Sequence, residues 1–240
     1  LKAEVGAETV EEGQAVSGAD VFVMATPDRL IGQITHQIIG KVQSGAAIVM
    51  LDAAAPHAGK LPERDDVSYF VTHPCHPPIF NDETEPAAKS DFFGGIHAKQ
   101  HIVCALMQGP EEDYARCEEV ARRSYAPVMR SHRCTVEQLA ILEPALSETV
   151  GATLALVLRE ATDEAVRRGV PEQAAHDFMM GHLNIELAIA FGIFPGGVFS
   201  DGALHAIDKA RPVIFKEGWM DAVFDPDAVM QSVKDICDAT

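Results

Sequence analysis

The chain has 240 residues, 47% of them hydrophobic, which is enough for one or two domains with buried cores. It carries 36 acidic against 19 basic residues, and the net charge of −17 argues against nucleic acid or an anionic membrane surface as a partner. The five cysteines are odd in number and form no C-x-x-C pair, which argues against a disulfide framework or a zinc site and favours a reducing, cytoplasmic location. No signal peptide is expected, and the apolar run at 183–194 is too short to span a bilayer.

The first half of the chain alternates short apolar runs with amphipathic segments. Buried strands are expected at 21–25, 46–51, 69–72 and 101–107, and helices at 11–16, 30–39 and 111–124. This alternation predicts the α/β class, a partial Rossmann-type, doubly wound parallel sheet over residues 1–133. Ligands of such sheets bind beyond the carboxyl ends of the strands, which here carry Thr26-Pro27, Asp52 and His73.

The second half, residues 134–240, has no convincing strand and is predicted to be an all-helical substrate-binding and dimerisation domain. Its long first helix, 135–168, begins with a capping box of Thr135 and Gln138 and stops at Gly169. Pro144 lacks a backbone donor, so a kink is expected there. Further helices are expected at 171–191, 203–217 and 226–237.

Residues 150–158 of the long helix are apolar nearly all round, so we expect them to be buried on every side. Few elements remain in the chain to cover them. This predicts a homodimer in which the long helices or their neighbours interdigitate, burying more than ~2,000 Å².

The layout resembles the 6-phosphogluconate and β-hydroxyacid dehydrogenase superfamily, in which a nucleotide-binding domain precedes a helical domain that opens on a long helix. The segments LEPALSETVGAT, GHLNIELAIAFG and THPCHPPIF are similar to the narrower family with the phosphogluconate dehydrogenase C-terminal domain, which includes D-apionate oxidoisomerases. The His-Pro pair is shared more widely and resembles that of prephenate dehydrogenases. The resemblance covers essentially the whole chain and implies NAD or NADP as cofactor.

One feature of that superfamily is missing. Its members begin with a strand, a G-x-G-x-x-G turn and a helix, and no G-x-G-x-x-G occurs here. We therefore expect that the first several tens of residues, which would hold the pyrophosphate and distinguish NAD from NADP, precede Leu1. The resemblance implies that Thr26 and Pro27, with Ala25 and Leu30 beside them, contact the cofactor. Asp52 is a further candidate for this role, or it caps the turn that follows.

His73 is the foremost catalytic candidate in the α/β half. A neutral imidazole at a strand end can take a hydroxyl proton as hydride leaves, whereas its structural alternative is a buried histidine bonded to a carbonyl. His76 lies close by, but Pro74, Pro77 and Pro78 exclude a helix that would present both imidazoles to one ion. No metal site is therefore predicted.

The helical half supplies two polar groups within apolar helices. Glu143 and Ser147 lie one turn apart beside Pro144, where a carboxylate could pass protons; the alternative is a surface glutamate. The second group interrupts a core-like run and either holds substrate or forms bonds between helices. Its members are His182, Asn184 and Glu186.

These residues predict an NAD(P)-dependent oxidoreductase that oxidises a hydroxyl of a polyhydroxy acid. His73, Glu143 and His182 are the catalytic candidates, which we expect around one cleft, and Ser147, Asn184 and Glu186 are the substrate-binding ones. If the chain is D-apionate oxidoisomerase-like, an acyl shift follows the oxidation.

Two alternatives remain open. One is an enzyme similar to ketol-acid reductoisomerase, with magnesium held by carboxylates, which would lose activity in a chelator. The other is a non-catalytic dimerisation or ligand-sensing module, which a G-x-G-x-x-G upstream of Leu1 would exclude.

Overall fold

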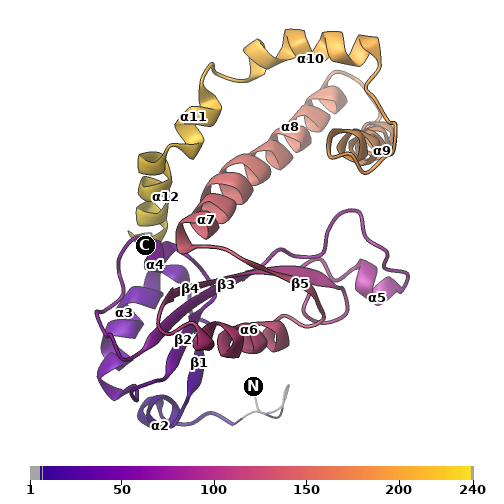
Figure 1. The fold of residues 1–240 in the computed structure, drawn as a ribbon. Coiled ribbons are helices and arrows are strands. Elements are labelled where there is room, and N and C mark those ends of the chain that lie inside the picture. The colour runs from indigo at the N-terminus through magenta and orange to yellow at the C-terminus, as the bar shows by residue number, and fades with distance from the viewer. Residues whose placement is uncertain (1–5, 7, 239–240) are drawn as a thin grey trace. The chain divides into compact units, whose positions relative to one another are not determined.

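The computed structural model describes residue 6 and residues 8–238 of the chain (Figure 1). The chain forms two compact units. Unit 1 comprises Leu1–Pro144 and Val229–Thr240, and unit 2 comprises Ala145–Ala228.

Unit 1 is built on a five-stranded sheet with the order β1-β2-β3-β4-β5. Its strands are β1 (Val21–Met24), β2 (Ala47–Met50), β3 (Ser68–Pro74), β4 (Gln100–Gln108) and β5 (Val128–Arg133). The helical segments among them are α2 (Glu12–Ser17), α3 (Asp28–Ile38), the short 3₁₀ turn Ile39–Lys41, α4 (Ala54–His57), α5 (Pro86–Lys89), α6 (Glu112–Ser124) and α7 (Val136–Ala140). The predicted α/β class and the four predicted strands, which correspond to β1, β2, β3 and β4, are confirmed.

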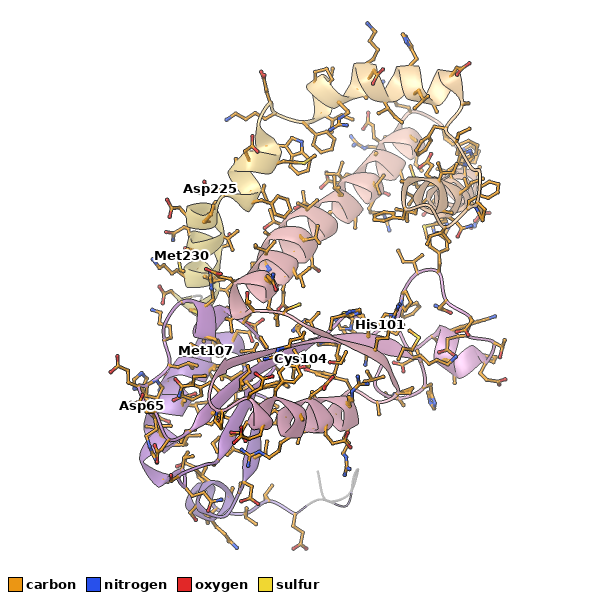
Figure 2. All side chains as sticks on the ribbon, viewed as in Figure 1. Asp65, His101, Cys104, Met107, Asp225 and Met230 are labelled. Carbon is orange, nitrogen blue, oxygen red and sulfur yellow. The ribbon has the colours of Figure 1, made fainter. Side chains whose placement is uncertain are left out.

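The two faces of the sheet are covered by different helices, because successive side chains of a strand point to opposite faces. On one face Ile48 and Met50 of β2 pack with Ile31 of α3. On the other face Val49 packs with Cys117 of α6, in a cluster that includes Cys104 of β4 (Figure 2). The first face also carries α7, whose Leu139 packs in a cluster with Val71 of β3. Every second residue of β3, counted from Val71, therefore points to the same face of the sheet, towards α7.

The sheet is mixed, which corrects the prediction of a parallel sheet throughout. β1, β2 and β3 are parallel, whereas β4 runs antiparallel to β3 and parallel to β5. Between β3 and β4 the chain forms only the short α5, not the long crossover helix that joins parallel neighbours. Apolar periodicity reports burial but not strand direction, so the sequence could not show this reversal.

β5 was not predicted. Its segment VMRSHR has neither an apolar run nor a clean alternation of apolar and polar residues, the two patterns that mark a strand. In the structure the segment is only partly buried. Its backbone pairs with β4 and extends the sheet by one strand.

The long helix is confirmed. It runs without a break over Val136–Arg167, as α7, a π-helical segment (Ile141–Ala152) and α8 (Thr153–Arg167). Thr135 and Gln138 form the predicted capping box. Pro144 lies inside the π-helical segment, so the expected interruption takes the form of wider helical turns there.

Unit 2 is helical throughout and contains no strand among its residues, all of which the structure describes. After α8 follow α9 (Glu172–Ala190), α10 (Asp201–Ile214) and α11 (Trp219–Phe224). The first two agree with the predicted helices, and α11 is additional.

α12 (Pro226–Asp238) belongs mostly to unit 1, because Val229 and Val233 are buried there. The compact units divide the chain between Pro144 and Ala145, whereas the predicted domains 1–133 and 134–240 stay a prediction. The predicted division of labour between a nucleotide domain and a substrate domain stays a prediction.

The expectation that residues 150–158 are buried on every side is wrong for the single chain. Leu156 is 66% exposed and Val157 41% exposed. Within unit 2, α8 contacts α9, and this leaves much of its apolar surface uncovered. By length and composition the helix Val136–Arg167 could also cross a membrane.

Candidate active site

Three polar residues lie in one row along the carboxyl edge of the sheet. Met24 of β1 pairs with Met50 of β2, and Met50 pairs with Val71 of β3. Two residues beyond this aligned triplet come Thr26, Asp52 and His73, on strands that are ~4.8 Å apart. The first three strands therefore carry one polar residue each to the edge at which ligands of doubly wound sheets bind.

His73 is held at the end of β3 by the neighbouring strand end. Its Nδ1 lies 2.9 Å from the carbonyl oxygen of Leu51, and because a carbonyl can only accept, Nδ1–H is the donor. This bond fixes the tautomer in which Nε2 of the neutral ring carries a lone pair. Burial is the largest influence on the pKa of His73 and lowers it, which favours the neutral form.

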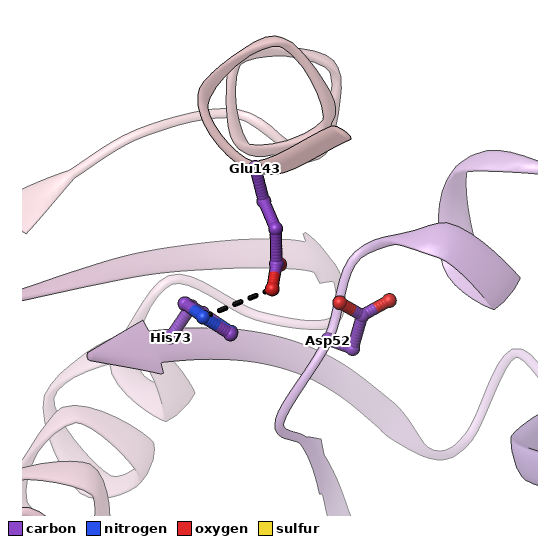
Figure 3. Close-up of side chains that lie close together, drawn as sticks. All are labelled: Asp52, His73 and Glu143. Atoms are coloured by element: carbon purple, nitrogen blue, oxygen red, sulfur yellow. Dashed lines mark ion pairs between the residues drawn. The ribbon is translucent and has the colours of Figure 1, made fainter. Parts of the chain in front are cut away.

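Glu143 lies on the helix above the sheet and contacts His73 (Figure 3). It follows Leu139 by one turn, and Leu139 is buried against the face of the sheet to which His73 points. Oε1 of Glu143 lies 3.0 Å from Nε2 of His73. The two side chains are 21% and 26% exposed, so the pair is reachable from solvent without being fully hydrated.

Asp52 completes a cluster with this pair. It is 8% exposed, and Oδ1 accepts a hydrogen bond of 2.6 Å from the backbone N–H of Ala54. One ligating atom from each of Asp52, His73 and Glu143 lies within 4.8 Å of the other two, a grouping that could hold a metal ion. We refer to these residues as the carboxylate–histidine cluster. Asp52 was predicted as a cofactor or turn-capping residue; it does cap the following turn, and it also belongs to this cluster.

Thr26 has a feature that fits a cofactor. Among the described residues its Oγ1 is one of the few buried side-chain polar atoms without a hydrogen-bond partner. Such a group normally finds a partner, so a bound molecule that hydrogen-bonds this hydroxyl suits the end of β1. Pro27 leads into α3 through the bond from Leu30 N–H to its carbonyl, 2.8 Å long, and Ala25 is exposed beside Thr26. The chain at this turn thus has room for the predicted contacts, which stay predictions.

His76 does not join the cluster. Its Nδ1 lies 2.9 Å from the carbonyl oxygen of Phe93, and its ring packs edge-on to the Phe93 ring. Its backbone has a φ of 59°, a left-handed conformation that directs the chain away from β3. His73 and His76 are therefore oriented by different carbonyls, with their ring centroids 6.2 Å apart.

The remaining predicted residues lie in unit 2. His182 on α9 stacks on Phe178, with ring centroids 3.8 Å apart, and its Nδ1 lies 2.9 Å from the Phe178 carbonyl oxygen. Ser147, Asn184 and Glu186 are exposed. Whether these residues take part in the same site as the carboxylate–histidine cluster stays a prediction.

His73 and Glu143 were expected around one cleft with His182, and the structure brings His73 and Glu143 into contact. Asp52 was named as a candidate but was not joined to them, because its place beside His73 depends on the register of β2 and β3. The role of the Leu51 carbonyl in orienting His73 had no signal in the sequence, because it depends on the register of β2 and β3.

Comparison with known protein families identifies the family of this chain. The family described as phosphogluconate dehydrogenase (decarboxylating) C-term matches residues 81–237, and the chain belongs to this family. Within it, the chain is similar to enzymes named D-apionate oxidoisomerase. The enzyme from Rhizobium rhizogenes is 53% identical over 98% of this chain and 85% of its own length. The predicted family is thereby confirmed.

Solved structures agree with this assignment. A crystal structure of a Cupriavidus necator protein, described as a semialdehyde dehydrogenase NAD-binding protein in complex with calcium and NAD, is 51% identical. Its TM-score is 0.95 over 98% of this chain and 85% of that chain. An NADH-preferring ketol-acid reductoisomerase from an uncultured archean is 16% identical, with a TM-score of 0.62 over 98% of this chain and 69% of that chain. This last likeness concerns the fold alone.

Proposed function

We propose that the protein is an NAD-dependent oxidoreductase that oxidises a hydroxyl group of D-apionate, a polyhydroxy acid, and isomerises the product. The observation that carries this proposal is the pair of His73 and Glu143, with Nε2 and Oε1 3.0 Å apart at the carboxyl edge of the sheet. The name of the similar enzymes and the NAD in the similar crystal structure support the substrate and the cofactor. The same similarity, over nearly the whole chain, favours an enzyme over a non-catalytic module.

The pair suits the removal of a hydroxyl proton. Nδ1–H of His73 is held by Leu51, so the lone pair on Nε2, beside Glu143, can accept a proton. Glu143 lies at the same nitrogen and stabilises the imidazolium that forms. The two residues together would move the proton away from the carbon that is being oxidised.

NAD, when bound, supplies the acceptor for the hydride. Thr26 is the residue of this chain that we assign to holding it, because the buried Thr26 hydroxyl lacks a partner among the described residues. Asp52 stands next in the row and can accept hydrogen bonds from substrate hydroxyl groups. The row would thus extend from the cofactor at β1 to the proton acceptor at β3.

The isomerisation needs an acid–base group beside the newly formed ketone. Glu143 is suited to this role because its carboxylate enters the site from the helix, opposite the strand ends (Figure 3). His182 is the other candidate, and its assignment rests on the sequence alone.

We also propose that the protein is a homodimer through unit 2. This unit exposes large apolar side chains, among them Leu156 at 66%, Phe178 at 67%, Phe191 at 76% and Val213 at 84%. Exposed apolar area of this extent marks a binding surface in a soluble protein. A second copy of the chain is favoured over a lipid bilayer because the long helix also carries Arg159, whose charge is costly within a membrane.

A cytoplasmic location remains a proposal. The five cysteines are all free thiols in the described chain, as expected for a reducing compartment.

The experiment that tests the function is a direct assay of the full-length protein. Purified enzyme is mixed with NAD⁺ or NADP⁺ and with D-apionate, and NADH or NADPH absorbance is followed while the product is identified by NMR. D-gluconate serves as the control acid. NAD⁺-dependent turnover of D-apionate to a rearranged ketone is expected. Reduction of neither cofactor by D-apionate would refute the proposal.

A further inference from the structure

We infer that Asp52, His73 and Glu143 together bind one divalent transition-metal cation and leave part of its coordination sphere open. No metal site was predicted from the sequence, and the geometry of the folded chain now supports one. Residues distant in the sequence bring one imidazole nitrogen and two carboxylates to a single point. The described chain offers no other grouping of three such side chains with this proximity.

The distance between His73 and Glu143 matches that between neighbouring ligands of one ion, and Asp52 lies close to both. With metal–ligand bonds of ~2.1 Å, neighbouring ligands of an octahedral ion are ~3.0 Å apart and opposite ligands ~4.2 Å apart. Nε2 of His73 and Oε1 of Glu143 are 3.0 Å apart, and the cluster's three ligating atoms lie within 4.8 Å of one another. A cation beside the pair, rather than between its two atoms, would contact both with little movement of either side chain.

The groups behind the cluster are arranged as they are behind metal ligands. A metal-binding histidine usually donates its second ring N–H to a carbonyl or carboxylate, which leaves the other nitrogen free for the metal. His73 does this through Nδ1–H and the Leu51 carbonyl. A ligating carboxylate is in turn usually hydrogen-bonded, and Asp52 accepts the N–H of Ala54 through Oδ1. Both ligands are thus oriented by the chain before any ion binds.

The charges of the cluster also favour a cation. Two carboxylates lie beside one imidazole, and Asp52 is 8% exposed. A carboxylate oxygen of Glu143 and the ring nitrogen of His73 that does not face Leu51 are both groups that bind a cation. A divalent ion would satisfy all three ligands and offset the charge of both carboxylates.

The ligand set selects the kind of ion. Calcium takes oxygen ligands almost entirely, whereas an imidazole with carboxylates suits Zn²⁺ or Mn²⁺. Three protein ligands are typical of catalytic sites, in which the remaining positions bind water or substrate. The ligand for those positions is a polyhydroxy acid, which chelates through adjacent oxygens.

The consequence for turnover rests on the proposed function, whereas the binding of the ion does not. A hydroxyl group that coordinates a cation loses its proton more readily, and a neighbouring carbonyl is polarised. His73 would then act by holding the ion, and it would not itself accept the proton. The substrate and the overall reaction are the same in both cases.

The test is a titration of the full-length protein after treatment with a chelator. Mn²⁺ binding is followed by the loss of the free-ion EPR signal, and Zn²⁺ binding by calorimetry. We expect one site per chain for each metal. Asp52→Asn, His73→Gln and Glu143→Gln should each weaken binding at least ~10-fold, on the scale of changes around metal sites. His76→Gln is the matched control and should bind as the wild type does.

The outcomes separate this inference from the proposed function. No binding of either metal by the wild-type protein up to about 1 mM, or undiminished binding in the three variants, would overturn the metal site. Thermal unfolding of each variant shows whether it is folded, and if one is not, the other two and the wild-type stoichiometry decide. Oxidation of D-apionate by metal-free protein would overturn the catalytic role alone. Metal binding without that oxidation would count against the proposed function alone.

Discussion

The backbone carbonyl of Leu51 accepts a hydrogen bond from Nδ1 of His73 at 2.9 Å. The end of β2 thus orients the side chain that leaves β3, and Nε2 points to Glu143 rather than to the sheet. The next residue after Leu51 is Asp52, which the same strand end places in the cluster. One turn of backbone therefore supplies both a member of the cluster and the bond that orients another member.

Asp52 has two separable roles, a backbone cap and a charge in the cluster. Asp52→Asn keeps an oxygen that can accept from Ala54 N–H, whereas Asp52→Ala removes it. We expect Asp52→Asn to unfold within ~0.5 kcal/mol of the wild type and Asp52→Ala to lose about 1 kcal/mol more, since that is the scale of one hydrogen bond. Both should lose turnover. Urea unfolding and steady-state kinetics check this, and an Asp52→Asn enzyme with full turnover would place Asp52 outside the site.

Gly109 follows the end of β4 and lies against the start of β3, where there is no space for a side chain. Its φ is +116°, and a Cβ there would lie 2.1 Å from Oγ of Ser68. Gly109→Ala should cost ~3 kcal/mol, from backbone strain together with the clash. Gly45→Ala is the matched control because Gly45 has a φ of +79° but open space around its Cβ position, so it should cost only ~1 kcal/mol. Equal losses in chemical denaturation would show that the contact with Ser68 is unimportant.

Arg64 ties the segment before β3 to the end of α3. It donates to the carbonyl oxygen of Ile39 at 2.7 Å and to that of Val42 at 3.1 Å, and it pairs with Asp66. The hydrogen bond from Arg64 lowers the pKa of Asp66 to about 2. The contribution of this carboxylate to stability is therefore complete above its unfolded pKa of ~3.9 and is lost as the pH falls towards about 2.

The matching experiment compares the melting temperatures of the wild type and Asp66→Asn across this pH range. The wild type should be the more stable at pH ~7, and the difference should shrink towards zero as the pH falls through ~2, because Asp66 then becomes protonated and neutral like Asn. Asp65→Asn, an exposed change at the preceding residue, is the control. A difference that is the same at both values of pH would contradict the ion pair.

Leu156 tests the proposed dimer. It is 66% exposed on α8 in the single chain, so in a monomer Leu156→Glu should alter stability by no more than ~0.5 kcal/mol. In a dimer that buries this face, the same change should shift sedimentation from dimer towards monomer at micromolar concentration. Glu160→Gln, an exposed polar position on the same helix, should leave the mass unchanged. A wild-type protein that sediments as a stable monomer would refute the proposal.

The parts of the fold that the sequence predicted well are those in which burial leaves a regular pattern. The apolar runs at β1, β2 and β3 identified three strands, and Thr135 with Gln138 identified the start of the long helix. The direction of β4 and the presence of β5 depend on pairing between distant residues, which periodicity does not report.

In the candidate site, too, single residues could be predicted from local patterns, whereas pairing between distant residues could not be predicted in full. His73 and Glu143 could be named because each is a polar residue at a break in an apolar pattern. The two were also expected around one cleft, and their contact agrees with this. The addition of Asp52 required the register of the sheet, and the exact contact required the packing of Leu139 beneath the helix. His182 and Asn184 lie in unit 2, and their roles stay predictions.

The kinetics of Glu143→Gln test the central claim most directly. Glutamine keeps the shape of the side chain but loses the charge that faces Nε2 of His73. In the full-length enzyme with D-apionate we expect kcat to fall ~10²-fold or more, with the Kd for NAD⁺ within about twofold of the wild type, because groups that transfer or stabilise protons contribute on that scale. Glu137→Gln, an exposed change on α7, is the matched control and should keep full activity. An undiminished kcat in Glu143→Gln would contradict the account and return the pair of Glu143 and His73 to a structural role.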